Sequence, residues 1–363
     1  MGGIDRGRAA FDRRAWANAY EELSAAAHHE PLEVEDLERL ACAARLVGHT
    51  TESSDVWTHA HQACVRAGDV TGAVRCAFWL AFCLLNGGEI GRGGGWIDRT
   101  QRLLDDEGSD CVERGYLRYL SALRSIFSGD VAAARAGFRE AVATGERFGD
   151  PELTALARIG EGRSLIYLGE PERGLALLDE AMVAIGTHEV SPIAMGDAYC
   201  TVIDGCQELF ELRRAREWTA ALSRWCDAQP DLVVYHGQCL LHRAELMQLG
   251  GAWTDAEEEV DRALRRLADP PGQPALAEAS YLRGELHRLR GELARAEDAY
   301  RAASGQGRDP QPGLALLRLA QGRVEAAVAA IRRVLQEAEG DVARARVLGA
   351  YAEIMLASGD VAA

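Results

Sequence analysis

Glycine residues recur along this chain at a spacing of about 40 positions, each after an apolar stretch typical of a helix. These turn positions are Gly48, Gly88, Gly129, Gly169, Gly251, Gly291, Gly322 and Gly359. The hexamer Ser-Gly-Asp-Val-Ala-Ala occurs around two of them, at 128–133 and 358–363. One gap is twice the usual step and indicates a degenerate turn near Phe210. A Gly turn that returns at a fixed period predicts a repeat protein.

Small residues flank the turns on both sides. Seven positions before each turn lie Ala41, Ala81, Ala122, Gly162, Ala244, Gly284, Ala315 and Ala352. Five positions after it lie Ala134, Gly174, Ala256, Ala296 and Ala327. Nine positions after it lie the larger Trp57, Ile97, Phe138, Leu178, Val260, Tyr300 and Ile331. Because antiparallel helices approach closely only where facing side chains are small, this pattern predicts helical hairpins that stack on one another.

The pattern therefore predicts an all-α chain that forms a right-handed superhelix, an α-solenoid of about nine to ten helical hairpins. The expected helices cover residues 14–28, 34–47, 52–67, 70–86, 95–106, 111–128, 130–147, 151–168, 171–186, 192–210, 213–227, 231–249, 253–268, 275–290, 292–303, 312–321, 323–338 and 341–358. Helix 14–28 is expected to be the second helix of a partial first unit. The Gly-rich segment 87–95 should make the start of helix 95–106 irregular, since Gly lowers helix propensity. No linker is long enough to divide the chain, so we expect one repeat domain over 1–363 with an incomplete last hairpin.

Two stretches carry a recognisable motif. The run from Gly284 to Ala303 resembles a tetratricopeptide hairpin, and so does the run from Gly162 to Met182. The repeat units are longer than in most tetratricopeptide proteins, with the excess in the loops between hairpins. The resemblance implies a tetratricopeptide-like superhelix.

The whole chain is similar to the tetratricopeptide-like region of large actinobacterial LuxR-type transcriptional regulators. The stretches that carry this similarity are 75–82 with its Gly-rich insert and Gly95-Trp96-Ile97, then 174–182, and 218–226. The resemblance implies a C-terminal helix-turn-helix that binds DNA. The chain lacks a Thr-x-Arg-Glu followed by an Asn-x-Glu-Ile-Ala recognition helix. We therefore expect DNA binding only through a module absent from this chain, which is either truncated or lacks that module.

Composition and charge exclude several classes of function. The formal net charge of −16 argues against direct binding to a phosphate backbone. All basic residues are Arg, so a P-loop lysine, a Schiff-base lysine and a Ser-Lys dyad are absent. The odd number of cysteines, nine, in apolar helical contexts fits a reduced cytoplasm better than a disulfide framework. The longest apolar run, 77–85, is too short to cross a bilayer, so no membrane association is expected.

Motifs for catalysis or metal binding are weak. The chain has no Gly-x-Ser-x-Gly and no His-Glu-x-x-His motif, and we expect no enzymatic activity, no catalytic residue and no cofactor. Two groups have metal-ligand residue types: His59, His61 and Cys64, and the more regularly spaced His236, Cys239 and His242. Helix packing is the favoured interpretation of both groups, so no metal is expected.

A binding surface is expected on the concave side, which the first helix of each hairpin lines in such folds. Counting back six and ten positions from each turn gives two rows that should lie together on this inner wall. With their predicted neighbours, the candidate residues are Phe78, Phe82, Tyr116, Tyr119, Arg163, Tyr167, Asp197, Asp204, Glu208, Glu245, Tyr281 and Glu285. Aromatic residues beside a few charges are typical of a groove for a peptide or a small ligand. For Phe78 and Phe82, simple packing is an equally good interpretation.

The leading hypothesis is a cytoplasmic sensing domain of a LuxR-type regulator that binds a small molecule, peptide or protein segment on this face. The alternative is a stand-alone scaffold for protein–protein interaction. A homodimer is a candidate assembly for either. An enzyme using the same fold is the third hypothesis, and it has the least support because no activated nucleophile is present.

Overall fold

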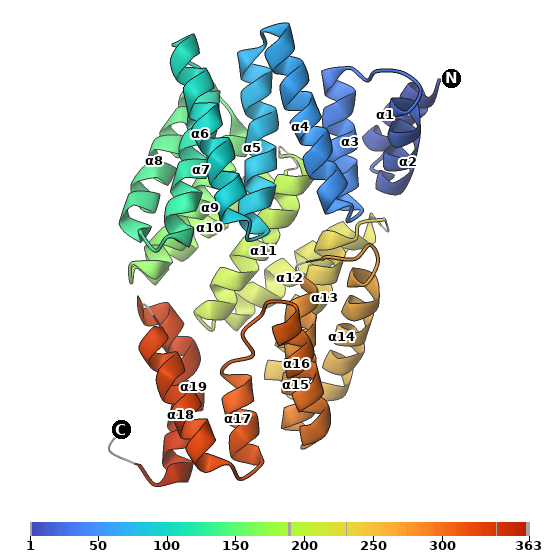
Figure 1. Ribbon diagram of the computed structural model, residues 1–363. Coiled ribbons are helices and arrows are strands. Elements are labelled where there is room, and N and C mark those ends of the chain that lie inside the picture. Colours follow the sequence, from blue (N-terminus) through green and yellow to red (C-terminus); the bar gives the residue numbers. More distant parts are fainter. Residues whose placement is uncertain (1, 188–189, 230, 274, 339, 361–363) are drawn as a thin grey trace. The chain divides into compact units, whose positions relative to one another are not determined.

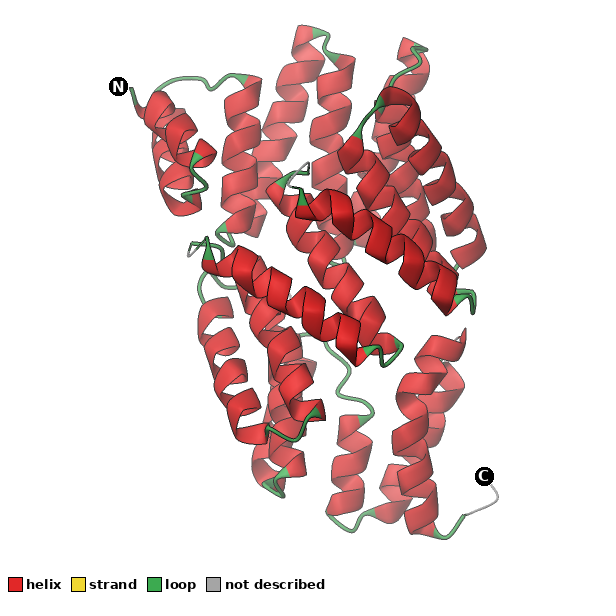
Figure 2. Cartoon of the chain, turned by 180° about the vertical axis from the view of Figure 1, so that it is seen from behind, coloured by secondary structure: helices red, strands yellow, loops and turns green. Residues whose placement is uncertain are grey.

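The computed structural model describes residues 2–187, 190–229, 231–273, 275–338 and 340–360, and within them the chain forms helices and loops only (Figures 1 and 2). The helices of this described part are α1 Gly3–Asp12, α2 Trp16–Ala27, α3 Val34–Leu46, α4 Thr50–Ala67, α5 Val70–Asn86, α6 Ile90–Glu107, α7 Glu113–Phe127, α8 Val131–Phe148, α9 Pro151–Tyr167, α10 Pro171–Gly186, α11 Pro192–Glu208, α12 Leu212–Asp227, α13 Val234–Leu249, α14 Trp253–Leu267, α15 Ala275–Leu289, α16 Leu293–Gly305, α17 Gly313–Ala320, α18 Val324–Glu337 and α19 Gly340–Ser358. The prediction of an all-α solenoid of helical hairpins is confirmed. Within the described ranges, no helix has both the length and the apolar composition needed to cross a membrane.

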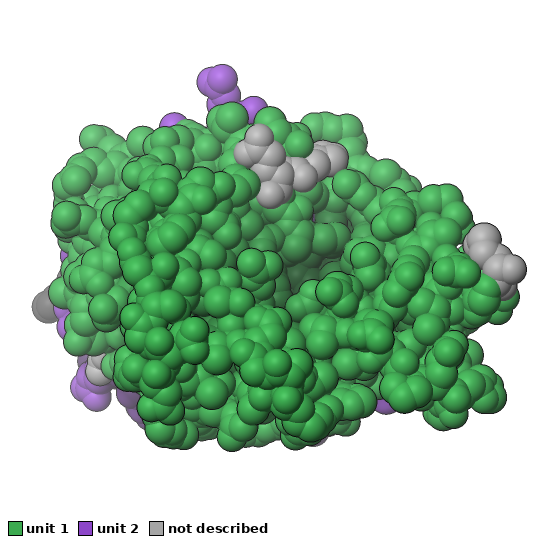
Figure 3. Space-filling view, turned by 90° about the horizontal axis from the view of Figure 1, so that it is seen from above, with its two compact units in different colours: residues 1–205, 224–235 green, residues 206–223, 236–363 purple. Residues whose placement is uncertain are grey.

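The chain comprises two compact units, which Figure 3 distinguishes by colour. Unit 1 consists of residues 1–205 and 224–235, and unit 2 of residues 206–223 and 236–363. The prediction of a single repeat domain remains a prediction. Residues 361–363, on which the expected incomplete hairpin depends, lie outside the described residues.

Within unit 1, the segment 224–235 packs back onto the first hairpins and onto α11. The indole Nε1 of Trp16 donates to Gln229 Oε1 at 3.0 Å, and both side chains are buried. The backbone N–H of Val233 donates to Leu46 O at 2.9 Å, and the Tyr235 hydroxyl donates to Ile193 O at 3.0 Å. These bonds connect segments of unit 1 that lie far apart in the sequence.

The repeated turn has one conformation throughout. All eight turn glycines have positive φ, between 75° and 94°. Phe210 takes the same left-handed conformation, with φ of 57°, which confirms the degenerate turn predicted there. In the Gly-Asp hexamer at 128–133, the Asp130 carboxylate accepts a bond from Ala133 N at 3.0 Å and so caps α8. The motif therefore combines a left-handed turn with a helix N-cap.

The first hairpin is complete, which corrects the prediction of a partial first unit. Helix α1 precedes α2, and Arg14 between them has φ of 59°. The spacing of turn glycines did not predict this hairpin, because Arg14 and not a glycine has the left-handed conformation in its turn. A Cβ on Gly7 of α1 would lie 2.6 Å from Leu23 Cγ, so the two helices are in close contact.

The hairpin interfaces are formed by the small residues that the spacing singled out. Ala41, Ala81, Ala122, Ala244 and Ala315, and their partners Ala134, Ala256, Ala296 and Ala327, are buried. Between α9 and α10 the backbones themselves meet, since a Cβ on Gly162 would lie 2.9 Å from Gly174 O. Ala352, in α19, differs from the prediction and is exposed.

The Gly-rich segment is more regular than its composition predicts. Helix α6 begins at Ile90, so four of its first six residues are glycines in a helical backbone. A Cβ on Gly93 would lie 2.8 Å from the Leu85 side chain, which explains that glycine by close packing on α5. Around Gly91 and Gly95 a Cβ would meet nothing within 4 Å. Packing against α5 therefore overrides the weak helix propensity of this segment.

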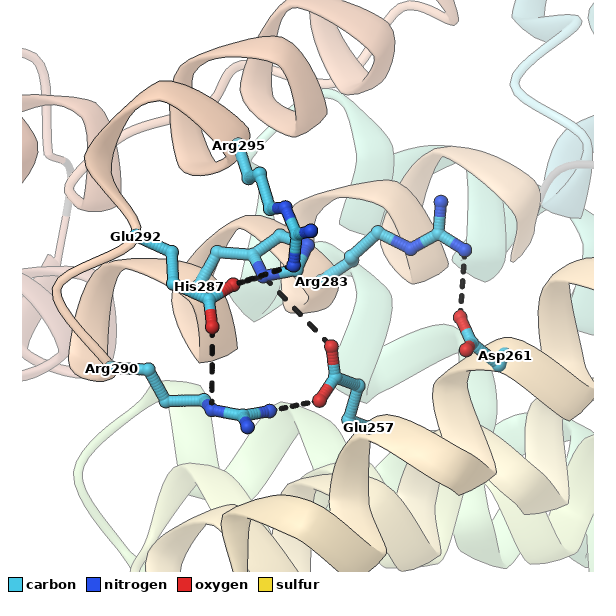
Figure 4. A network of polar contacts seen from close by, with 7 residues as sticks. All are labelled: Glu257, Asp261, Arg283, His287, Arg290, Glu292 and Arg295. Atoms are coloured by element: carbon cyan, nitrogen blue, oxygen red, sulfur yellow. Dashed lines mark hydrogen bonds and ion pairs between the residues drawn. The ribbon is translucent and has the colours of Figure 1, made fainter.

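Ion pairs connect the hairpins of unit 2 at their surfaces (Figure 4). His287 Nδ1 lies 2.8 Å from Glu292 Oε2 and 3.9 Å from Glu257 Oε1. Arg290 pairs with both of these carboxylates, and Arg295 reaches Glu292 at 3.2 Å. Along the same helices, Arg283 pairs with Asp261 at 2.7 Å. The network joins α14, α15 and the start of α16, which indicates a structural role.

Candidate functional site

A cavity of about 200 Å³ lies in unit 1 at the first helices of successive hairpins. We call it the inner cavity; its walls are Asn86, Tyr119, Leu123, Ile126, Phe138, Leu156, Ile159, Gly160, Arg163, Tyr167, Asp197, Ala198, Thr201 and Asp204. These residues come from the end of α5 and from α7, α8, α9 and α11. Seen from above, the surface of unit 1 is hollowed (Figure 3).

The inner cavity brings together five of the twelve candidate residues, namely Tyr119, Arg163, Tyr167, Asp197 and Asp204. It also includes Leu123 and Ile159, which belong to the two rows counted back from the turns. Helices α7, α9 and α11 are each the first helix of their hairpin, and the row members Tyr119, Leu123, Ile159, Arg163 and Asp204 line this cavity. Their role in binding remains a prediction.

Arg163 is held between its own helix and α11. Its Nη2 donates to the Tyr167 hydroxyl at 2.5 Å, and the guanidinium carbon lies 4.9 Å from the centre of the Tyr167 ring. A Cβ on Gly205 would lie 2.6 Å from Arg163 Nη1. The absence of a side chain at Gly205 therefore leaves room for the buried guanidinium. Its distance from the Tyr167 ring is that of a cation–π contact.

Asp197 is the carboxyl whose ionisation is most sensitive to this environment. Burial raises the pKa of Asp197 to about 7, since it disfavours the charged form, and the neighbouring Asp204 adds to the effect while Arg45 opposes it. Asn86 Nδ2 donates to Asp197 Oδ1 at 3.2 Å. The side chain remains partly exposed at the cavity wall. It is therefore accessible to a ligand and changes charge near neutral pH.

Sequence reasoning missed Asn86 and Arg45 as part of this environment. Asn86 is the last residue of α5, next to the turn, and Arg45 is near the end of α3. Neither belongs to a position counted back from the turns. The only signal in the sequence was that both precede a turn glycine by two or three positions.

An aromatic cluster reaches the inner cavity through Tyr119 and Phe138. Phe78 contacts Phe82, Tyr116 and Tyr119, with ring centroids 4.7 to 5.9 Å apart, and Tyr119 contacts Phe138 at 5.3 Å. Phe78 and Phe82 are 1% and 2% exposed. Phe82 does not line the inner cavity, so its position corresponds to the packing interpretation.

A second cavity of about 520 Å³ borders this aromatic cluster, also within unit 1. We call it the acidic cavity; its walls are Glu38, Trp57, Arg75, Phe78, Trp79, Val112, Tyr116, Phe148, Gly149, Asp150, Pro151 and Glu152. Two of the candidate residues, Phe78 and Tyr116, are among them. The Tyr116 hydroxyl lies 3.1 Å from both oxygens of Asp150.

The remaining four candidate residues belong to unit 2 and make contacts there. Glu208 pairs with Arg346 at 3.0 Å, and Glu245 lies 3.6 Å from His242 Nδ1. Arg308 lies over the Tyr281 ring, 4.1 Å from its centre. Glu285 pairs with Arg288 at 2.9 Å and accepts a hydrogen bond from the Tyr300 hydroxyl. These charges are therefore engaged within the unit.

The two His/Cys groups are positioned for packing. His61 is buried; Arg99 Nε donates to its Nε2 at 3.0 Å, so its Nδ1 carries the proton and donates to Ala73 O at 2.8 Å. His59 is exposed, whereas Cys64 is buried. In the second group Cys239 and His242 are buried. Within the described ranges, no three His, Cys, Asp or Glu residues are arranged to hold a metal ion.

No protein-family model matches the chain, and no curated protein matches it either. Solved structures do. The hetero-tetramer Cut9–Hcn1 of the APC/C matches with a TM-score of 0.64 and 13% identity, over 92% of this chain and 58% of that one. This chain therefore spans little more than half the length of the matched chain.

Two further structures match along nearly their whole length. A Rap protein complexed with competence and sporulation factor matches with a TM-score of 0.54 and 11% identity, over 99% of this chain and 98% of that one. The apo form of the quorum sensor NprR from B. thuringiensis matches with a TM-score of 0.53 and 10% identity, over 90% and 94%. At such identities the likeness shows the fold alone, which is an all-helical tetratricopeptide-like solenoid.

Proposed function

We propose that this chain is a sensing domain that binds a small molecule or a peptide in the inner cavity. The observation that carries the proposal is the convergence of Tyr119, Arg163, Tyr167, Asp197 and Asp204 on one cavity from three neighbouring first helices. Enclosed sites with aromatic walls and a few directed polar groups are typical of ligand binding.

The chemistry of the cavity favours a ligand that carries both a donor and an acceptor. The Asp197 and Asp204 carboxyls accept hydrogen bonds, whereas the Arg163 guanidinium and the Asn86 amide donate them. A peptide segment or an amino-acid-like molecule offers both kinds of group. The volume of about 200 Å³ suits one such group or one side chain rather than a large metabolite.

The fold provides further support for a peptide. Among the similar structures, one is a quorum sensor and another is complexed with competence and sporulation factor. Both use a helical solenoid of the same kind. By analogy, we place the ligand of this chain on the inner wall, which is an inference from fold and not from shared residues.

We further propose that the sensing domain belongs to a LuxR-type transcriptional regulator of the cytoplasm. The similarity of stretches 75–97, 174–182 and 218–226 to that family supports this assignment. Ligand binding would be transmitted to a helix-turn-helix encoded outside these residues. The assignment fails if the gene encodes no such module in the same reading frame.

The alternative function is a stand-alone scaffold that recruits proteins, with a homodimer as a candidate assembly. The exposed Phe210, Leu249 and Leu356 of unit 2 favour it, since large exposed apolar side chains are common at protein interfaces. We propose no catalysis, because the sequence carries no catalytic motif and the solved structures that share the fold support a binding role.

The experiment tests whether the inner cavity binds a small compound. The full chain is incubated with the low-molecular-weight fraction of a cell extract, and retained compounds are identified by mass spectrometry. Asp197→Asn and Arg163→Gln should lose the retained compound, whereas Asp106→Asn and Arg102→Gln on the exposed face of α6 should keep it. Retention that is unchanged in the first pair of variants contradicts the inner cavity as the site.

A further inference from the structure

We propose that the acidic cavity binds an organic cation, an ammonium group carried on a compact apolar body. This site is separate from the inner cavity and does not rest on the function proposed above. Three features of its walls carry the inference: aromatic rings, a buried indole N–H without an acceptor, and carboxylates that exceed the available cations.

Aromatic rings from four helices form the apolar walls. They are Trp57, Phe78, Trp79, Tyr116 and Phe148. Phe78 is in edge-to-face contact with Trp79 at 5.0 Å and with Tyr116 at 4.7 Å, so three of the rings are held in fixed mutual orientation. The Arg147 guanidinium already lies over the Phe148 ring, 4.5 Å from its centre, so the other four rings are the ones that could contact a ligand. The faces of such rings attract cations, and aromatic cages are a common device for binding quaternary ammonium groups.

The indole of Trp57 points to a missing hydrogen-bond acceptor. Its side chain lines the cavity and is only 4% exposed. Its Nε1–H has no hydrogen-bond partner within the described part of the chain. A buried donor that lacks a partner costs free energy, about 1–3 kcal/mol. A ligand with a hydroxyl or carbonyl oxygen beside its ammonium group would supply the acceptor.

The charges of the cavity walls are unbalanced. Glu38, Asp150 and Glu152 contribute three carboxyls, against the single guanidinium of Arg75. Arg75 Nε pairs with Glu113 at 3.2 Å, so part of its charge is already compensated. Asp150 is occupied as the N-cap of α9 and by the Tyr116 hydroxyl. Glu38 and Glu152 form no ion pair with any described residue, and they are the carboxylates that an incoming cation would meet.

Glu38 and Glu152 each make a hydrogen-bond contact, and these contacts do not prevent either carboxyl from pairing with a bound cation. Glu152 Oε2 accepts from the backbone N–H of Ser191 at 2.5 Å, and Glu38 Oε1 lies 3.6 Å from Cys76 Sγ. Burial raises the pKa of both carboxyls. Carboxyls whose charge is destabilised by burial gain the most from a nearby cation.

Other ligand classes fit the walls less well. An anion would be repelled by Glu38 and Glu152. A metal ion would need a cluster of hard or imidazole ligands, and the described residues contain no such group of three. The aromatic faces favour an organic cation over a small inorganic one, since the inorganic ion would retain its water and make no contact with the rings.

Choline and phenethylamine are suitable probes, with the neutral carbon isostere of choline as the control, in which a tert-butyl group replaces trimethylammonium. Binding to the full chain is followed by calorimetry and by tryptophan fluorescence. We expect saturable binding of at least one cation, at least about tenfold tighter than that of the isostere, which corresponds to about 1.4 kcal/mol.

Variants assign the binding to this cavity. Glu38→Gln and Glu152→Gln should each weaken the cation by about tenfold, and Trp57→Phe, which retains an aromatic ring, should weaken it by less. Glu107→Gln at the exposed end of α6 and Asp197→Asn in the inner cavity should leave it unchanged. Two Glu variants are made so that the test still holds if one of them fails to fold. Far-UV circular dichroism checks that each variant is folded.

Three results would overturn the inference. One is that neither cation binds; another is that the neutral isostere binds as tightly as choline. The third is cation binding that survives both Glu38→Gln and Glu152→Gln in folded protein. None of these results bears on the inner cavity, because the Asp197→Asn and Arg163→Gln variants test that site independently.

Discussion

At the scale of single residues, two glycines in helices have opposite consequences for the same substitution. A Cβ on Gly162 would lie 2.9 Å from the backbone oxygen of Gly174, whereas a Cβ on Gly95 would meet nothing. Gly162→Ala should therefore destabilise the chain by about 1–3 kcal/mol, because backbone cannot move aside as a flexible side chain can. Gly95→Ala should stabilise it by about 0.5–1 kcal/mol through helix propensity. Urea unfolding of both variants measures the difference.

If Gly162→Ala proves neutral, α9 and α10 are farther apart than the structure has them. The Gly95→Ala variant is the matched control, since it introduces the same methyl group into an exposed helical position.

Asp197 predicts a dependence of stability on pH. Because its pKa is raised to about 7 in the folded chain, the folded state retains a proton that the unfolded state loses from about pH 4 upward. The stability contributed by the neutral carboxyl is thus present at low pH and is lost as pH rises through about 7. Asp197→Asn should remove this loss, so the variant gains stability relative to the parent between about pH 5 and about pH 8.

The measurement is the urea midpoint of parent and variant at several pH values in this window. Asp106→Asn, at an exposed position, should show no such trend. A constant difference between parent and Asp197→Asn across the window would mean that this carboxyl titrates as an ordinary aspartate.

At the scale of the helical hairpin, introducing a charged residue tests whether the small residues lie at the interface between the two helices. Ala296 is fully buried and packs with Tyr300 and Leu317. Ala296→Asp should cost several kcal/mol, roughly 3–5, because it places a carboxylate without a partner between helices. Ala294→Asp is the control, since Ala294 is exposed in the first turn of the same helix, where an acidic residue is favourable.

Thermal melts of the two variants give the comparison. Equal melting temperatures for Ala296→Asp and the parent would show that the helix register assigned here is wrong.

The elements were largely predictable from the sequence because their signals are local. The turn positions require a left-handed backbone conformation, which glycine adopts without strain. The spacing of glycines therefore located most hairpins. It failed where another residue accepts that conformation: Arg14 hid the first hairpin, while Phe210 was found only because the period demanded a turn there. The Gly-rich start of α6 was misjudged because packing of Gly93 on Leu85 is a tertiary effect.

At the scale of the whole molecule, the stability of a repeat protein is a sum of hairpin and neighbour terms, so damage should remain local. In Ala296→Asp, we expect faster amide hydrogen exchange in α14 to α17 of unit 2, with exchange in α5 to α9 of unit 1 close to that of the parent. Hydrogen exchange followed by mass spectrometry resolves the two sets of helices. Equal acceleration throughout would instead indicate one cooperative folding unit.

The sequence by itself determined the class of fold, the period, the turns and the small residues of the hairpin interfaces, since each depends on neighbours within one hairpin. Only the tertiary structure decided which inner-wall residues share a cavity. Asn86, Arg163 and Asp197 meet in one site, and Glu38, Trp57 and Glu152 in another, although each set is spread over more than one hundred residues of chain. Their meeting depends on how side-chain sizes at successive interfaces rotate each hairpin on the last. These rotations accumulate over several units, and no local pattern encodes them.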